Sequence, residues 1–333
     1  MEAAEGQCAD AHPTTPDTRL PETVPHDRAF AHPALFYRGE AEYLDATLGF
    51  VRDGLAAGEP VAVAVPTPRL ALLRDALGEQ GREVHFTDMS QAGRNPGRII
   101  PGVLRAFYDA HRPGPVRIIG EPVWPGRTAL EYPACVQHEA LINAAFAGRA
   151  ATILCPYDAE GLAPPALADA RATHPVVIEG GREQVSPGYA PERAVAAHNT
   201  PLPEPGHAAA FAFDTGRLRA ARQFAVKVAA GLGLAGARLD DLALAAAELT
   251  TNSVRHGGGS GEIRVWAADG EVVCEVRDAG LIEDPLAGRH VPVPGRPGGR
   301  GLLMVHRLAD LVRVHTGPAG TVIRCHLAPA DAT

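Results

Sequence analysis

The sequence contains no long apolar run, no basic N-terminal leader and no concentrated block of basic residues. A membrane-spanning helix needs about 20 consecutive apolar residues, and no stretch of the 333-residue chain reaches that length. The first five residues include two glutamates, which argues against a secretory signal. The net charge of −8 and the scattered arginines argue against a nucleic-acid groove. We therefore expect a cytoplasmic protein that contacts neither a membrane nor nucleic acid directly.

Cysteine is scarce, and its spacing shows no metal or redox pattern. The five cysteines are Cys8, Cys135, Cys155, Cys274 and Cys325, and no two of them form a Cys-x-x-Cys pair. Scattered single cysteines suit a reducing compartment. The fourteen histidines also show no metal-ligand spacing. We expect each cysteine to be a small buried hydrophobe rather than a redox centre.

The length of the chain predicts two domains, and the sequence pattern indicates where they lie. Residues 1–29 are rich in proline, threonine and acidic residues, so we expect a disordered tail. Strand-like runs alternate with helices in residues 30–178, which predicts an α/β domain with a parallel sheet. Residues 179–209 lack periodicity and are rich in proline, glycine and alanine, so we expect a linker. Residues 210–330 form the second predicted domain.

The strand pattern of the front domain is clearest in Val61–Val65, an unbroken apolar run typical of a buried parallel strand. Further strands are expected at 84–88, 116–120 and 151–155, and helices at 40–57, 69–77, 97–111 and 132–146. The loop at 66–70 follows the first of these strands, where a P-loop would bind phosphate. It contains no Gly-Lys-Ser/Thr, so we expect no phosphate cradle there.

Four segments of the front domain carry a more specific signal. They are residues 32–37 (HPALFY), 58–65 (GEPVAVAV), 118–124 (IIGEPVW) and 154–158 (LCPYD). These segments resemble the MEDS sensory domain over roughly residues 30–178. The resemblance implies a RecA-like α/β fold that senses a signal in a bacterial regulator.

A small-molecule signal would bind outside the carboxyl ends of the strands, as ligands of open α/β sheets do. The candidate residues for such a sensory pocket are His32, Tyr37, Glu121 and Trp124. Glu121 is the strongest of them, because a carboxylate directly after a buried strand is costly unless it is used. Packing or capping is the alternative role for each residue.

Four motifs follow one another in the rear domain. The first is an apolar helix that carries Glu248 and Asn252 one turn apart, on the same face. The second is Asp278 and Gly280, at the end of a strand-like run. The third is residues 295–301, with four glycines and two arginines before an apolar helix, and the fourth is Gly320-Thr321 at the start of a closing strand.

Each motif also has an ordinary structural explanation, and only their combination indicates a nucleotide site. A solvated helix stripe, a hairpin turn, a surface loop and a β-branched strand residue explain the motifs one at a time. Together they offer what a magnesium nucleotide needs. Asn252 supplies a hard oxygen ligand for Mg²⁺, and backbone amides of a glycine-rich loop before a helix bind phosphate.

This series resembles the nucleotide site of the GHKL ATPase/kinase superfamily over roughly residues 211–328. The sequences ELTTNSVRHG (248–257) and GGRGLLMV (298–305) are most similar to RsbW-type anti-sigma-factor serine kinases. The resemblance implies a Bergerat α/β sandwich that binds ATP and Mg²⁺. It implies that Asn252 binds the metal, that Glu248 is the general base and that Asp278 reads the adenine amine. The other nucleotide contacts it implies are Arg255, His256, Gly280, Gly298, Gly299, Arg300, Gly301, Leu302 and Thr321.

The combination of both domains resembles the RsbA family of anti-sigma regulatory proteins. This resemblance implies a switch kinase that sequesters a sigma factor and phosphorylates a serine or threonine of an anti-anti-sigma (STAS) partner. The front domain would respond to a small-molecule signal, and a homodimer is compatible with the family.

Two alternatives to the switch kinase stay open. A sensor histidine kinase needs a phospho-acceptor histidine on a helical hairpin, which His198 and His207 in a proline-rich linker fit poorly. The other alternative is an ATP-binding protein that holds a sigma factor without phosphotransfer. The presence of Glu248 and Asn252 argues against this second alternative without excluding it.

Overall fold

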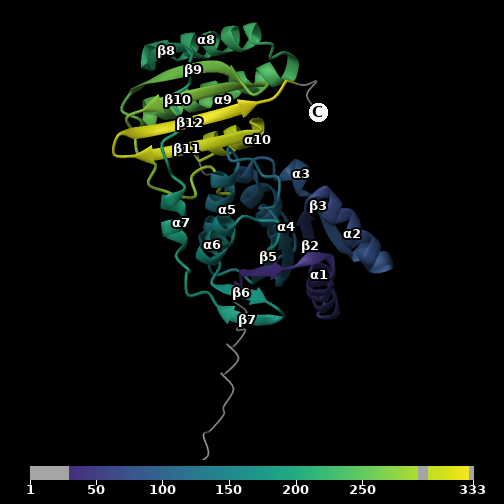
Figure 1. The fold of residues 1–333 in the computed structure, drawn as a ribbon. Coiled ribbons are helices and arrows are strands. Elements are labelled where there is room, and N and C mark those ends of the chain that lie inside the picture. Colours follow the sequence, from purple (N-terminus) through teal and green to yellow (C-terminus); the bar gives the residue numbers. More distant parts are fainter. Residues whose placement is uncertain (1–29, 292–298, 330–333) are drawn as a thin grey trace, which may run out of the picture.

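The computed structural model describes residues 30–291 and 299–329, which form two α/β units, each built on its own sheet (Figure 1). The tail at residues 1–29, for which the sequence predicts disorder, lies outside the described residues. In the described part of the chain, no helix combines the length and the apolar composition needed to cross a membrane. The four cysteines within that part, Cys135, Cys155, Cys274 and Cys325, are buried and free.

The first unit contains a seven-stranded sheet with the order β3-β2-β4-β5-β1-β6-β7. Its strands are β1 (Pro33–Tyr37), β2 (Val61–Val65), β3 (Val84–Asp88), β4 (Val116–Gly120), β5 (Ala151–Asp158), β6 (Val176–Glu179) and β7 (Arg182–Val185). Every neighbouring pair is parallel except the closing β6–β7 hairpin. The parallel sheet predicted from the apolar runs is therefore confirmed.

Helices cover both faces of this sheet, and each face has its own apolar core. They are α1 (Gly39–Ala56), α2 (Thr67–Leu77), α3 (Met89–Ala92), α4 (Arg105–Ala110), α5 (Tyr132–Phe146), α6 (Pro164–Thr173) and α7 (Pro191–Ala197). The helix expected at 97–111 is broken into a 3₁₀ turn, η2 (Pro96–Arg98), a π-helical segment, η3 (Ile100–Leu104), and α4. Pro101 explains the break, because proline lacks an amide donor and clashes with the preceding turn.

The second unit is a two-layer sandwich of one antiparallel sheet and three helices (Figure 1). The strands β8 (Ala209–Asp214), β9 (Ser260–Ala268), β10 (Glu271–Asp278), β11 (Leu311–Gly317) and β12 (Gly320–Leu327) have the order β11-β12-β10-β9-β8. Their apolar face packs against α8 (Leu218–Gly231), α9 (Gly236–His256) and α10 (Gly301–Leu308), and a short turn, η4 (Thr215–Arg217), precedes α8. The predicted fold class, a parallel-sheet domain followed by an α/β sandwich, is confirmed.

The linker is shorter than the sequence predicts. Within the predicted range of 179–209, β7 extends the first sheet and α7 packs against α5 and α6. Pro191 occupies the first turn of α7, where proline is favoured because its missing amide needs no partner. The proline content that indicated a linker therefore marks a helix start, and the connection between the units is confined to about residues 199–208.

Candidate functional site

Helix α9 brings Glu248 and Asn252 to the N-terminus of α10. Its apolar residues pack in the sandwich core, whereas Glu248 and Asn252 are only partly buried. A Cβ placed on Gly301, the first residue of α10, would lie 2.6 Å from Glu248 Oε2 and 3.3 Å from Asn252 Nδ2. The acidic and amide side chains therefore face unpaired amides of a helix start, where phosphate groups bind favourably.

The end of α9 packs directly on Asp278, the last residue of β10. Ser253 Oγ donates a hydrogen bond of 2.6 Å to Asp278 Oδ2, and the Gly280 amide donates one of 2.8 Å to Oδ1. A Cβ on Gly257 would lie 2.3 Å from Asp278 Cγ, so no side chain fits at that position. Ser253 and Gly257 were not predicted as site residues. A serine on the buried face of an apolar helix, one turn before a glycine, is the signal that could have found them.

Thr321 lies beside Asp278, because β10 and β12 pair these two residues. Thr321 Oγ1 donates to the Gly280 carbonyl at 2.9 Å and lies 2.8 Å from Thr316 Oγ1. Gly320 has a φ of +118°, and a Cβ there would lie 2.1 Å from the Asp278 carbonyl oxygen. Only glycine fits this close approach of two backbones.

Replacing Gly320 with alanine is expected to destabilise the sandwich by about 2–4 kcal/mol, because the new Cβ would meet backbone at a left-handed φ. Urea unfolding of the full chain followed by circular dichroism measures the loss. Gly317→Ala is a matched control in the same hairpin, because no described atom lies within 4 Å of a Cβ there. Equal unfolding midpoints for the two variants would contradict the steric argument.

The remaining predicted nucleotide contacts lie around this centre. Gly299 and Arg300 are exposed just before α10, and Leu302 is partly buried in its first turn. Arg255 and His256 are exposed in the last turn of α9. Gly298 lies outside the described residues. The structure thus brings Glu248 and Asn252 to Gly301, and it brings Asp278, Gly280 and Thr321 together at the end of the same helix, α9.

Helix α10 connects this site to the first unit. Its last carbonyl groups accept hydrogen bonds from residues 94–98, which we call the junction segment. Asn95 Nδ2 donates to the His306 carbonyl at 2.9 Å, and Arg98 Nε donates to the same oxygen at 2.8 Å. The last carbonyls of a helix have no partner within the helix, so the junction segment caps α10 from the other unit.

The four predicted sensory residues do not form one pocket. His32 belongs to the face of the first sheet covered by α5 and α6, whereas Tyr37 belongs to the opposite core. Trp124 is partly exposed, and the guanidinium of Arg127 stacks on its ring at 3.7 Å. The sheet itself therefore separates His32 from Tyr37.

Glu121 is the most unusual of these residues electrostatically. It is 2% exposed, and its Oε2 has no hydrogen-bond partner within the described residues. Burial raises its pKa to about 8, although nearby Arg69 opposes the shift. Arg69 Nη2 also donates to Tyr37 Oη at 3.3 Å and stacks over the Tyr43 ring. A carboxyl group that is neutral near pH 7 can donate a hydrogen bond, so Glu121 stays a candidate for ligand contact.

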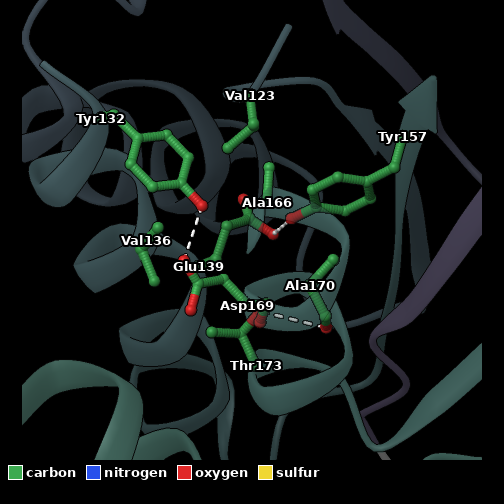
Figure 2. Close-up of a pocket in the computed structure, with 9 residues that line it drawn as sticks. All are labelled: Val123, Tyr132, Val136, Glu139, Tyr157, Ala166, Asp169, Ala170 and Thr173. Carbon is green, nitrogen blue, oxygen red and sulfur yellow. Dashed lines mark hydrogen bonds between the residues drawn. The ribbon is translucent and has the colours of Figure 1, made fainter. Parts of the chain in front are cut away.

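A second buried cluster of polar side chains surrounds His32, and no spacing in the sequence predicts it. Glu139 on α5 lies in the wall of a small cavity and accepts a hydrogen bond of 3.2 Å from Tyr157 Oη (Figure 2). Behind it, His32, Cys155 and His174 approach the same carboxylate. Burial, followed by the proximity of His174, lowers the pKa of His32 to about 4. His32 is therefore a neutral imidazole at physiological pH.

Comparison with known proteins agrees with this division. Residues 31–175 match the family described as the MEthanogen/methylotroph, DcmR Sensory domain (MEDS), and residues 211–327 match the histidine kinase-like ATPase domain. No curated protein matches the chain. Both matches fall where the sequence motifs predicted them, so the chain contains a region similar to the MEDS domain followed by a region similar to the histidine kinase-like ATPase domain.

Among solved structures, a likeness was found to the RsbU and RsbW domains of a protein from Mycobacterium tuberculosis. The two chains are 22% identical, the match covers 38% of this chain and 34% of the other, and the TM-score is 0.28. The present chain thus spans about a third of that structure.

Proposed function

We propose that the chain is a cytoplasmic anti-sigma regulatory factor that phosphorylates a serine or threonine of an anti-anti-sigma (STAS) partner with ATP. The observation that supports this proposal most directly is the approach of Glu248 and Asn252 to the first residue of α10. The end of the same helix, α9, packs on Asp278, which pairs with Thr321. The choice of sigma factor and STAS protein as partners rests on the RsbW-type sequence around 248–257.

In the proposed kinase, each group would have a role when MgATP is bound. Asn252 offers its carbonyl oxygen to Mg²⁺, which prefers a few protein oxygens together with phosphates. The amides at the start of α10 receive the phosphates. Glu248 lies beside them and orients the attacking hydroxyl, because phosphoryl transfer needs positioning more than covalent chemistry. Asp278 already accepts two hydrogen bonds, but a carboxylate has about four acceptor sites, so it can still accept from the adenine amine.

Helix α10 provides a physical route for regulation. Phosphate would bind at its N-terminus, while the junction segment of the first unit holds its C-terminus. A signal molecule changes the affinity for ATP only if it binds two conformational states of the protein with different free energies. We propose that the first unit favours one position of α10 through Asn95 and Arg98, and thereby sets the balance between partner binding and phosphotransfer.

Glu248→Gln is expected to lower phosphotransfer to a STAS partner by roughly 10²–10⁴-fold, the usual contribution of a positioned acid or base. ATP binding should change little, since the amide keeps the size of the side chain. Transfer of label from γ-labelled ATP measures the rate, and calorimetry measures binding. Asp240→Asn, at the exposed start of the same helix, is the control and should behave as wild type.

The same assay separates the alternatives. Acid-stable label in a serine or threonine of the partner supports the switch kinase. Tight ATP binding without transfer to any candidate partner supports a sigma-sequestering protein. Acid-labile label on the chain itself supports a histidine kinase, and substitution of His198 and His207 would then abolish it. Undiminished transfer by Glu248→Gln would remove Glu248 as the catalytic residue.

A further inference from the structure

Four side chains with metal-binding groups meet inside the first unit. His32 precedes β1, Cys155 lies on the adjacent strand β5, Glu139 lies on α5, and His174 caps the C-terminus of α6. Each is at most 1% exposed. Their nitrogen, sulfur and carboxylate atoms all lie within 4.8 Å of one another. Parallel pairing of β1 with β5 and the packing of both helices on one sheet face produce this juxtaposition.

The distances agree with a tetrahedral site. His32 Nε2 lies 3.4 Å from Cys155 Sγ and 3.7 Å from Glu139 Oε2, and His174 Nε2 lies 2.9 Å from the same carboxylate oxygen. Metal–ligand bonds of about 2.0 to 2.3 Å give a tetrahedron with edges of about 3.3 to 3.8 Å. Small side-chain rotations therefore suffice to place all four atoms around one ion.

The second nitrogen of each imidazole is already held by a hydrogen-bond acceptor. His174 Nδ1 lies 2.8 Å from the carbonyl oxygen of Ala170, so this nitrogen carries the proton. Asn143 Nδ2 donates to the Thr173 carbonyl at 2.8 Å, which turns Asn143 Oδ1 towards His32 Nδ1 at 3.2 Å. Both histidines thus direct Nε2 into the cluster while Nδ1 is held outside it, the arrangement typical of metal-binding histidines.

Without an ion, the cluster leaves one buried polar atom unsatisfied. Glu139 Oε1 has no hydrogen-bond partner within the described residues. A buried carboxylate is also stabilised by a positive charge nearby, and a divalent cation supplies one.

We propose that His32, Glu139, Cys155 and His174 bind one Zn²⁺ ion. Two imidazoles, one thiolate and one carboxylate form a mixed nitrogen, sulfur and oxygen set that suits zinc, whereas Mg²⁺ and Ca²⁺ prefer oxygen ligands alone. The ion would tie two strands to α5 and α6 below the cavity in which Glu139 lies (Figure 2). The site is distinct from the nucleotide site, and its test requires no ATP.

The test uses the full chain, refolded in the presence of a chelator and then dialysed against ZnCl₂ or CoCl₂. We expect one equivalent of zinc by mass spectrometry, a higher melting temperature with zinc, and a cobalt spectrum with intense tetrahedral bands and a thiolate charge-transfer band. Cys155→Ser should remove the charge-transfer band, and His174→Ala should weaken zinc binding by about 100-fold or more. Cys135→Ser is the matched control, since Cys135 is buried in the same core outside the cluster.

Circular dichroism establishes that each variant is folded, and Asn143→Ala tests the site without changing a ligand. It should weaken zinc binding by about 10–100-fold, because Asn143 orients His32. Three results would overturn the proposal: a wild-type chain that retains no stoichiometric zinc, a cobalt complex with octahedral bands and no thiolate band, or undiminished binding by folded Cys155→Ser and His174→Ala variants.

Discussion

Replacing Asn252 with alanine is expected to weaken Mg²⁺-dependent ATP binding by about 100-fold, or ~2.7 kcal/mol, while the fold is retained. Asn252 is partly exposed and faces the first residue of α10, so its side chain contributes to the site more than to the core. Its neutral carbonyl oxygen is the hard ligand that Mg²⁺ requires. Titration calorimetry with ATP, in Mg²⁺ and in EDTA, measures the metal-dependent part of the affinity.

Thr251→Ala is the matched control for this experiment. Thr251 precedes Asn252 on α9 but lines the groove between α8 and α9, away from the nucleotide site. Its substitution should leave ATP affinity unchanged. In EDTA the wild type and Asn252→Ala should bind ATP equally, because the metal contact is then absent from both. Equal affinity in Mg²⁺ would show that Asn252 is not a metal ligand.

Much of the fold follows from short-range patterns in the sequence. The run Val61–Val65 and the later apolar runs became adjacent parallel strands, because strands buried on both faces have no polar positions. The helix and strand within residues 179–199 could not be predicted from apolar patterns. Strand β7 is exposed along its whole length and therefore has no apolar pattern, and α7 is only seven residues long and begins with a proline.

The proximity of the two leading candidate residues could be predicted because it arises within a single helix. Glu248 and Asn252 share a helix face by spacing alone, and glycine-rich segments are visible wherever they occur. The contacts that complete the site were not predictable in this way. Ser253 meets Asp278 only when α9 packs on β10, and no spacing in the sequence encodes that packing.

The His32 cluster shows the same limit more strongly. The sequence shows no metal-ligand spacing among its histidines and cysteines, because His32, Glu139, Cys155 and His174 come from four separate elements. The pairing of β1 with β5, distant in the chain but adjacent in the sheet, brings the four together. Ligands of this kind are found only once the order of the strands is known.

The junction between the units gives the other large expected effect. Gly97→Ala should separate the first unit from α10, because a Cβ at Gly97 would lie 2.0 Å from His306 Nδ1. The imidazole has little room to move aside, because His306 is 1% exposed. Overpacking of this kind typically destabilises a protein by about 1–3 kcal/mol. The loss of stability should affect the interface between the two units rather than either hydrophobic core.

We therefore expect Gly97→Ala to unfold in two calorimetric transitions where the wild type shows one, and to be cut faster by protease in residues 199–208. Gly102→Ala is the matched control, because it lies in the next turn and no described atom is within 4 Å of a Cβ there. Adding His306→Ala to Gly97→Ala should restore part of the coupling between the units, since it removes the ring that the new methyl group meets. A Gly97→Ala chain that matches Gly102→Ala in both measurements would show that the junction segment does not hold α10. The two units would then respond to their ligands independently, and the proposed route from the sensory domain to the nucleotide site would be lost.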